Sequence, residues 1–424
     1  MRDARQVTEA RQASGGVLVV GGGFAGAYVA RELGDRGATI VSKENFMLYT
    51  PLLPEAASGT LEPRHCVVPL RVMCPHAELI LGAVTALDLE AQTASVETDE
   101  GPQTVGWREL VLALGAVPRT LPIPGLTEHA LSFKSLADAI NLRNHVLHQL
   151  EAADAAPDEK ERSRRLTFVF VGGGYAGVEA LAELSDLAED ALRYYPRLRS
   201  TPRHWVLVDA APRILPEIPP PLGDYAAAEL RKRGMEIHVD TTLESVSADE
   251  AVLGDGTRIA TNTLVWTAGV APNPVLREWS LPLDEKGRVE VDEVLRVRGH
   301  EHVWSLGDCA RVPNTRSDRP DPPTCQHALR QARRLARNLT GPPEPYGYMM
   351  LGQVATLGRH KGIAEVLDLR LHGFLGWWVT RSYHLYQLPL ASRKFRVVVD
   401  WTVSLFFRRD IAELGQLGHP EKLS

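Results

Sequence analysis

Cysteine is scarce in this chain, and long hydrophobic runs are absent. The 424 residues include four cysteines, Cys66, Cys74, Cys309 and Cys325, and none of them form a C-x-x-C or C-x4-C pair. This spacing disfavours a redox disulfide and a cysteine–histidine metal site, so we expect no metal and a reducing, cytosolic compartment. No apolar run reaches the roughly 18 residues of a membrane-spanning helix, so we expect no transmembrane helix.

An excess of positive charge is also missing. The chain carries 47 Lys and Arg against 53 Asp and Glu, a net charge of −6, which disfavours a nucleic-acid binder. The first nine residues have no apolar core, so we expect no signal peptide. The hydrophobic content of 44% is typical of globular proteins, and the length suggests two or three domains.

A glycine-rich turn near the start of the chain predicts a dinucleotide site. Residues 17–20 read as a buried strand, and residues 27–33 have helical spacing. The turn between them fits G-x-G-x-x-G, in which the glycines allow a tight turn, close approach of a pyrophosphate and close helix–strand packing. The residues expected to contact the cofactor are Gly21, Gly22, Gly23, Phe24, Ala25 and Gly26.

The same pattern occurs a second time, 151 residues later. Residues 168–171 form a strand pattern, and a helix pattern follows the second glycine turn. Two such turns indicate two dinucleotides, a tightly held FAD and a diffusing nicotinamide that exchanges a hydride with it. The expected contacts in the second turn are Gly172, Gly174, Tyr175 and Gly177.

An acidic residue at the end of the following strand is expected to bind a ribose. In the second repeat this residue is Asp209, whose charge would repel a 2′-phosphate, so NADH is favoured over NADPH although Arg213 lies near. In the first repeat the position is open between Ser42, at the strand end, and Glu44, in the loop beyond it.

Further strand ends and one rigid loop complete the predicted cofactor sites. Ala113 and Gly115 follow a buried strand at 110–112, and Ala268 and Gly269 follow another at 264–267. Asp308 follows the strand at 303–306, where it can accept a hydrogen bond from a ribityl hydroxyl. The apolar loop at 46–54 contains two prolines and fits either a flat ring system or a buried core.

The last segment differs in composition from the rest of the chain. Residues 371–409 are rich in aromatic and basic residues, which predicts contact with an anionic membrane surface, with a dimer interface or a packed helix as the alternatives. The residues expected to insert are Trp377, Trp378, Val397, Val399, Trp401, Leu405 and Phe406. The expected surface cations are Arg381, Arg393, Lys394, Arg396, Arg408 and Arg409.

Together the glycine repeats, the 49–53 loop and the strand ends resemble the two-dinucleotide-binding-domain flavoproteins, and among them the type II NADH dehydrogenases (NADH:quinone oxidoreductases). The resemblance runs from Gly21 to about Arg409. It implies an α/β fold with two Rossmann-like, glutathione-reductase-like domains. The implied domains are a polar arm at 1–15, an FAD-binding domain at 16–135 and 270–345, an NADH-binding domain at 136–269, and a C-terminal domain at 346–424 with an amphipathic, membrane-facing segment.

The resemblance also implies roles for individual residues. The first turn and Asp308 would hold non-covalent FAD, and the second turn and Asp209 would hold NADH. Glu179 would lie near both rings and Pro51 near the isoalloxazine. Electrons would pass from NADH through FAD to a membrane quinone, without proton pumping, in a peripheral protein on the cytoplasmic side of the plasma membrane.

The quinone-side helix of the family reads Ala-Gln-x-Ala-x-Gln, and this chain departs from it. Gln326 and Ala328 match, Cys325 replaces the first Ala, Arg330 stands where the second Gln is expected, and Gln331 follows one place late. Gln326 and Gln331 are the predicted catalytic residues on this helix, beside Glu179 in the second repeat.

Other functions compatible with the same architecture are a soluble reductase with a ferredoxin-type acceptor, a sulfide:quinone oxidoreductase that uses Cys309 and Cys325, and a flavin-bearing redox sensor. The quinone type and the oligomeric state, including a homodimer, stay open at this point.

Overall fold

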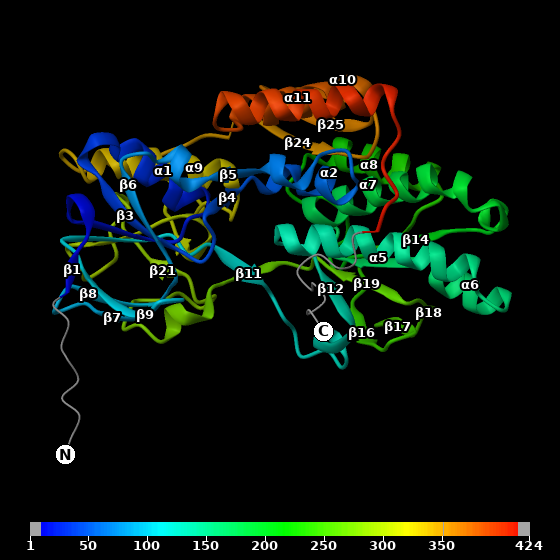
Figure 1. The fold of residues 1–424 in the computed structure, drawn as a ribbon, viewed down its shortest axis with the longest axis horizontal. Coiled ribbons are helices and arrows are strands. Elements are labelled where there is room, and N and C mark those ends of the chain that lie inside the picture. Colours follow the sequence, from blue (N-terminus) through cyan, green and yellow to red (C-terminus); the bar gives the residue numbers. More distant parts are fainter. Residues whose placement is uncertain (1–9, 351, 414–424) are drawn as a thin grey trace, which may run out of the picture. The chain divides into compact units, whose positions relative to one another are not determined.

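The computed structural model describes residues 10–350 and 352–413, and the chain forms two compact units (Figure 1). Each unit is assembled from three separate segments of the sequence. The first unit comprises Met1–Leu48, Val67–Val117 and Val270–Met349, and the second comprises Tyr49–Cys66, Pro118–Gly269 and Met350–Ser424. Most of the predicted N-terminal arm lies outside the described residues, and its remainder contains the short strand β1 (Arg11–Gln12).

The first unit is built around a five-stranded parallel sheet. Its strands, in spatial order, are β22 (Val303–Ser305), β10 (Glu109–Leu112), β2 (Val17–Val20), β3 (Ala38–Ser42) and β6 (Ala77–Leu81). All four residues of β2 are buried, because the central strand of a parallel sheet is covered on both faces. The helices α1 (Phe24–Leu33) and α9 (Cys325–Asn338) pack against each other.

Smaller elements complete the first unit. An antiparallel sheet contains β7 (Ala83–Asp88), β8 (Thr93–Thr98) and β9 (Gly101–Gly106), and β1 joins it in parallel. The remaining pairs are β4 (Phe46–Leu48) with β5 (Val67–Pro69), β11 (Ala116–Pro118) with β20 (Val270–Pro272), and β21 (Val289–Glu290) with β23 (Ala310–Arg311), and α3 (Leu70–Met73) follows β5.

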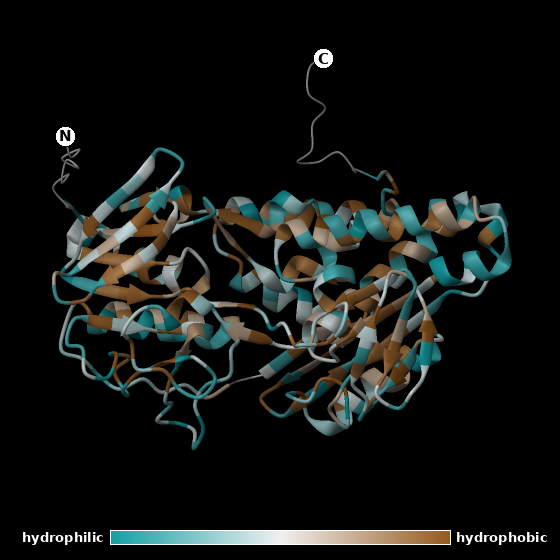
Figure 2. Ribbon diagram, turned by 90° about the horizontal axis from the view of Figure 1, so that it is seen from below, coloured by the Kyte–Doolittle hydropathy of each residue, from teal (hydrophilic) through white to brown (hydrophobic). Residues whose placement is uncertain are grey.

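The second unit repeats the parallel-sheet design. Its strands, in spatial order, are β12 (Ala130–Ser132), β19 (Thr263–Trp266), β13 (Thr167–Val171), β14 (His204–Val208) and β15 (Glu236–His238). Its helices include α4 (Leu126–His129), α5 (Leu136–Asp154), α6 (Glu159–Arg165), α7 (Tyr175–Ala191) and α8 (Pro220–Lys232). Figure 2 shows the strands of the parallel sheets as hydrophobic, which is why they form the cores of the two units.

Two further parts of the second unit frame its parallel sheet. The antiparallel strands β16 (Leu243–Val246), β17 (Glu250–Leu253) and β18 (Arg258–Ala260) share a buried apolar cluster with β13, β14 and β19. The short helix α2 (Leu53–Ala57) packs against α7 and α5. The predicted apolar loop at 46–54 therefore ends in a buried helix of the second unit.

The last described segment is an integral layer of the second unit. Its three-stranded antiparallel sheet contains β24 (Gly352–Thr356), β25 (Gly362–Val366) and β26 (Leu369–His372). Helix α10 (Gly373–Gln387) packs on this sheet, and α11 (Ala391–Phe406) lies beside α10 (Figure 1). Within the described residues, no helix combines the length and the apolar character needed to cross a bilayer.

The burial of residues on α10 and α11 shows that part of the predicted membrane contact is wrong. Trp377, Val397 and Trp401 were expected to insert into a membrane, but all three are buried, with at most 9% of their surface exposed. Residues four apart share one helix face, so Val397 and Trp401 face inwards together. The apolar side chains that are exposed on the two helices and just beyond them are Phe374, Leu375, Trp378, Tyr386, Phe395, Val398, Val399, Val403, Leu405, Phe406 and Phe407.

Candidate functional site

The glycine turn of the first unit joins β2 to α1. Gly21 has a φ of +113°, and a Cβ there would collide with the carbonyl oxygen of Ala113. A Cβ at Gly26 would likewise collide with the carbonyl of Gly21, whereas one at Gly23 would meet nothing within 4 Å. The turn therefore packs tightly on its protein side and is open at Gly23, as a pyrophosphate site at the N-terminus of α1 requires.

Two other strand ends reach the same edge of this sheet. Ala113 follows β10 and donates its N–H to Val20 of β2, at 2.9 Å. Gly307 follows β22, where a Cβ would lie 3.1 Å from the Cβ of Ala25 in helix α1. Asp308 comes next and is partly buried, and a Cβ at Gly115 would meet nothing within 4 Å. The predicted FAD contacts of this unit thus gather at the carboxyl ends of adjacent parallel strands, which fits a dinucleotide site.

Ser42 and Glu44 were the two candidates for the adenosine ribose of FAD. Ser42 is the last residue of β3 and is 9% exposed, and its hydroxyl packs on Gly22 of the glycine turn. Glu44 is exposed, and its backbone N–H donates to the Ser42 hydroxyl at 3.3 Å. The geometry therefore favours Ser42 as the residue beside the turn.

Helix α9 carries the two glutamines that were predicted to be catalytic. Gln331 is 2% exposed, and its amide oxygen accepts the backbone N–H of Gly307 at 2.8 Å. Its amide nitrogen donates to the carboxylate of Asp321, also at 2.8 Å. Gln331 therefore holds the turn that leads to Asp308, while Gln326 is partly exposed and accepts the hydroxyl of Tyr348 at 3.4 Å.

No sequence pattern predicts Asp321, on which several hydrogen bonds around Gln331 converge. Its carboxylate accepts hydrogen bonds from Gln331, from the Tyr346 hydroxyl at 2.7 Å and from the Asn314 amide at 2.7 Å. The carboxylate is also 3.6 Å from His327. Asp321 lies in a loop rich in Asp and Pro, and only the fold shows that it is buried.

Cys309 and Cys325, the two cysteines of the first unit that a sulfide-oxidising site would use, favour the neutral thiol form. Cys309 is fully buried, and burial raises the pKa of its thiol above the ordinary value. Burial also raises the pKa of the Cys325 thiol to about 12. Because the thiolate is the reactive form, both residues are poorly suited to redox chemistry at neutral pH.

The glycine turn of the second unit repeats the geometry of the first. Gly172 has a φ of +119°, and a Cβ there would lie 2.5 Å from the carbonyl carbon of Thr267. A Cβ at Gly174 or at Gly269 would meet nothing within 4 Å. Tyr175 begins α7, Gly177 packs against the Gly172 carbonyl, and Ala268 follows β19 at the same edge of the sheet. This turn also has the form of a dinucleotide site.

Asp209 comes directly after β14, where the sequence places it. One carboxylate oxygen accepts the backbone N–H of Gly173, and the other accepts the N–H of Ala211 at 2.6 Å. Arg213 points elsewhere, because it donates to the backbone carbonyls of Ile218 and Pro216. The carboxylate is thus fixed beside the second glycine turn, next to where an adenosine ribose would lie.

Glu179 lies one turn into α7 and is 7% exposed. Its carboxyl group accepts the backbone N–H of Thr356 in β24 at 2.9 Å. The pKa of Glu179 is raised to about 8. Burial is the largest cause; the hydrogen bond from Thr356 lowers the pKa, and the charges of Glu183 and Glu55 raise it. Pro51 lies in a 3-10 turn, Thr50–Leu52, of the same unit.

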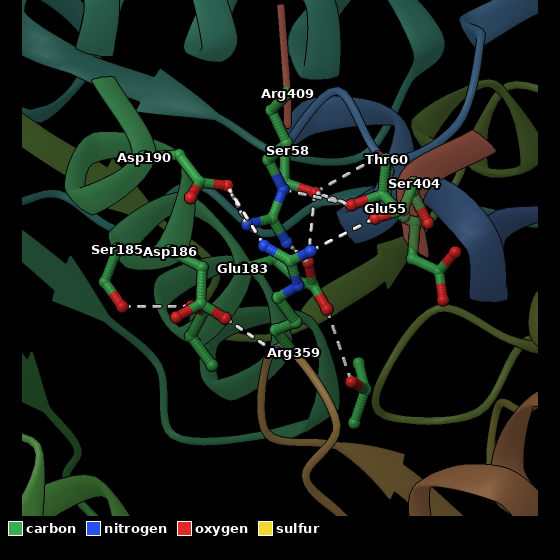
Figure 3. A network of polar contacts seen from close by, with 12 residues as sticks. Glu55, Ser58, Thr60, Glu183, Ser185, Asp186, Asp190, Arg359, Ser404 and Arg409 are labelled. Carbon is green, nitrogen blue, oxygen red and sulfur yellow. Dashed lines mark hydrogen bonds and ion pairs between the residues drawn. The ribbon is translucent and has the colours of Figure 1, made fainter. Parts of the chain in front are cut away.

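A buried ionic network surrounds α7, and sequence reasoning missed it (Figure 3). Arg409, from the segment after α11, donates to Glu183 of α7 at 2.9 Å. Arg381 of α10 donates to Glu55 of α2 at 3.1 Å, and Trp401 donates to the same carboxylate. Arg381 and Arg409 were predicted as surface cations, but their side chains are only 12% and 6% exposed. Partners more than 200 residues apart leave no local pattern in a sequence.

Comparison with known proteins agrees with this geometry. A family described as pyridine nucleotide-disulphide oxidoreductase matches residues 15–332. A Dictyostelium discoideum protein named "Probable NADH dehydrogenase" is 33% identical over 389 residues, which cover 88% of this chain and 85% of the relative. The type II NADH:quinone oxidoreductase Ndh of Mycobacterium tuberculosis is 30% identical over 93% of this chain and 88% of its own.

The solved structures include a close match in fold. NDH2 from Plasmodium falciparum, solved in complex with NADH, superposes with a TM-score of 0.88 over 95% of this chain and all of that chain. The sequence identity of this pair is 17%, so the match establishes the shared architecture.

Proposed function

Because the chain belongs to the family of type II NADH:quinone oxidoreductases, we propose that it oxidises NADH and reduces a membrane quinone without pumping protons. One observation supports this most directly. Each unit presents a glycine turn with one open position, Gly23 or Gly174, at the N-terminus of a helix. Two such turns are what a flavin dinucleotide and a nicotinamide dinucleotide need.

We assign the first unit to FAD and the second to NADH. FAD, when bound, supplies the ring that accepts a hydride and passes on two electrons. Hydride transfer requires no protein base, so the contribution of this chain is to bind and orient the two dinucleotides. Ser42, Asp308 and the first turn are suited to FAD, and Asp209 and the second turn to NADH. Glu179 is a buried titratable group of the NADH unit and the candidate residue beside the nicotinamide.

The exposed apolar face of α10 and α11 supports a peripheral contact with a membrane. The face includes Phe374, Trp378, Val399 and Phe406, each at least 41% exposed. Arg396 and Arg408 are exposed beside these apolar residues and can approach anionic headgroups. Quinone would then be taken from the bilayer. We place this membrane contact on the cytoplasmic side, where NADH is available.

The experiment that tests the proposal separates the two half-reactions. Purified holoprotein is mixed anaerobically with NADH, and bleaching of the flavin absorbance is followed; menaquinone and ubiquinone analogues in vesicles are then added. We expect rapid bleaching and rapid reoxidation by at least one quinone. Bleaching by NADH without reoxidation by either quinone would overturn the proposal and indicate a different acceptor, such as a ferredoxin.

The rival reading as a sulfide:quinone oxidoreductase can be tested in the same assay. It needs reactive cysteines near the flavin, and burial raises the pKa of both the Cys309 and Cys325 thiols. We therefore expect no flavin reduction by sulfide, and a Cys309→Ser and Cys325→Ser double variant should keep its NADH-driven reduction. Reduction by sulfide that the double variant loses would favour the rival.

A further inference from the structure

Five acidic side chains and four arginines meet around α7 in the second unit, and Figure 3 shows part of this network, including Glu183, Asp190 and Arg409. The acids come from α2 and α7, and the arginines come from the C-terminal end of α8, the β24–β25 turn, α10 and the segment after α11. The acids are Glu55, Glu179, Glu183, Asp186 and Asp190, and the arginines are Arg233, Arg359, Arg381 and Arg409.

Four of the acids have an arginine partner. Arg233 lies 2.6 Å from Asp186, Arg381 lies 3.1 Å from Glu55, and Arg409 lies 2.9 Å from Glu183. Asp190 is shared, because Arg409 approaches it at 3.3 Å and Arg359 at 3.6 Å. Such pairing offsets the cost of burying each charge.

Glu179 is the acid left over. Among the described residues no cation lies within 4 Å of its carboxyl group, and its hydrogen-bond donor is the backbone N–H of Thr356. A buried carboxyl group without a cation is most stable with its proton on. Burial also raises the pKa of Asp186, but there Arg233 and Arg409 oppose the effect.

Glu179 and Glu183 are linked directly. They lie four residues apart, on one face of α7, and Thr356 bridges them with its N–H on Glu179 and its hydroxyl 3.4 Å from Glu183. Glu183 also accepts the Ser58 hydroxyl at 3.0 Å. The cation that faces Glu183 is Arg409, so the charge beside Glu179 is balanced from the segment after α11.

We propose that Arg409 is a positioning residue for the NADH site: by pairing with Glu183 it balances the charge one helical turn from Glu179 and leaves Glu179, which has no cation, as the acid that keeps its proton. The functional consequence rests on the proposed function, in which Glu179 lies beside the nicotinamide. A segment that lies after the last helix in the sequence thus sets the charge beside a group in the glycine-motif helix.

A purely structural role for Arg409 predicts something different. In that case its removal lowers stability and leaves the protonation of the glutamates unchanged. The matched variants are Arg409→Met, Arg409→Lys, which keeps the charge, and Arg408→Met, which removes a neighbouring exposed arginine. The readout is the carbonyl stretching band of protonated carboxyl groups in infrared spectra of the holoprotein, recorded against pH.

At neutral pH the wild type should show one protonated carboxyl band that Glu179→Gln abolishes. Arg409→Lys and Arg408→Met should keep this pattern. Arg409→Met should gain a second band, because Glu183 has lost its cation, and the second band should vanish in Arg409→Met/Glu183→Gln. A wild-type band that survives Glu179→Gln would overturn the proposal, as would an Arg409→Met spectrum that matches the wild type.

A Glu183→Gln variant covers a failure of Arg409→Met to fold, because Asp190 still faces Arg409 in it. In Glu183→Gln the Glu179 band should titrate at a lower pH than in the wild type, since the charge of Glu183 no longer raises the pKa of Glu179. An unchanged midpoint would overturn the proposal. The infrared titration uses no NADH, so its outcome is independent of the kinetic test of the proposed function.

Discussion

Ser42 and Asp209 occupy equivalent positions in the two units. Each comes at the end of the strand that pairs with the glycine-turn strand, β3 beside β2 and β14 beside β13. Each packs on the middle glycine of its turn, Ser42 on Gly22 and Asp209 on Gly173. The difference between a neutral hydroxyl and a carboxylate at one structural position leads to two separate predictions.

Ser42→Ala should weaken the binding of FAD about five- to tenfold, because one hydrogen bond is worth roughly 1–1.5 kcal/mol. Glu44→Ala is the matched control, since Glu44 is exposed two residues further on. The affinity is measured by titrating the apoprotein with FAD and following the quenching of flavin fluorescence. If Glu44→Ala weakens binding and Ser42→Ala does not, the ribose contact belongs to Glu44.

Asp209→Asn should reduce the preference for NADH over NADPH by at least about tenfold, or about 1.4 kcal/mol. The amide keeps the size of the side chain but removes the charge that repels a 2′-phosphate. The ratio of kcat/KM for the two nucleotides measures this, with Glu244→Gln, at an exposed position of β16 in the same unit, as the control. A wild-type enzyme that already prefers NADPH would contradict the assignment of Asp209.

Glu179→Gln should change how stability depends on pH. Native Glu179 has a pKa of about 8 against an ordinary value of 4.5, so between these values the native state keeps a proton that the unfolded state has released. Its contribution to stability is complete below pH 4.5 and is lost as pH rises towards 8, by ~1.4 kcal/mol per pH unit. Chemical denaturation of wild type and variant across this range should show a flatter profile for the variant; parallel profiles would contradict the raised pKa.

Two neighbouring tryptophans of α10 distinguish the exposed apolar face of α10 and α11 from the buried face of the helix. Trp378→Ala should weaken binding to phosphatidylglycerol vesicles at every salt concentration and leave Tm nearly unchanged, because Trp378 is 58% exposed. Trp377→Ala should lower the free energy of unfolding by about 3–5 kcal/mol, because Trp377 is buried. Vesicle sedimentation and thermal denaturation measure the two effects.

Salt dependence distinguishes the charges of this face from its apolar side chains. Arg396→Glu with Arg408→Glu should weaken vesicle binding mainly at low salt, since each surface cation contributes roughly 1 kcal/mol and is screened. If the protein fails to bind anionic vesicles at every salt concentration and instead forms dimers that Trp378→Ala dissociates, the exposed apolar face of α10 and α11 is an interface between copies of the chain.

The sequence predicts the local elements of this fold and little of the long-range pairing. The glycine turns, their strands and Asp209 could be read directly, because strand, turn and helix are contiguous and each glycine has a steric reason. The inward-facing residues Trp377 and Trp401 were assigned to the wrong face, because composition alone does not give the rotation of a helix. Arg409 looked like a surface cation, since its partner Glu183 lies 226 residues earlier.

The position of Arg409 in the chain has a consequence for synthesis. Residues of α2 and α7 are made long before it, and their carboxylates are matched by cations that emerge from the ribosome only later. Burying the charge of Glu183 is costly until Arg409 has been translated. The second unit should therefore complete its folding late, and the first glycine turn of the chain should fold earlier. A nascent chain that stalls between α11 and Arg409 is therefore expected to expose α7 to proteases.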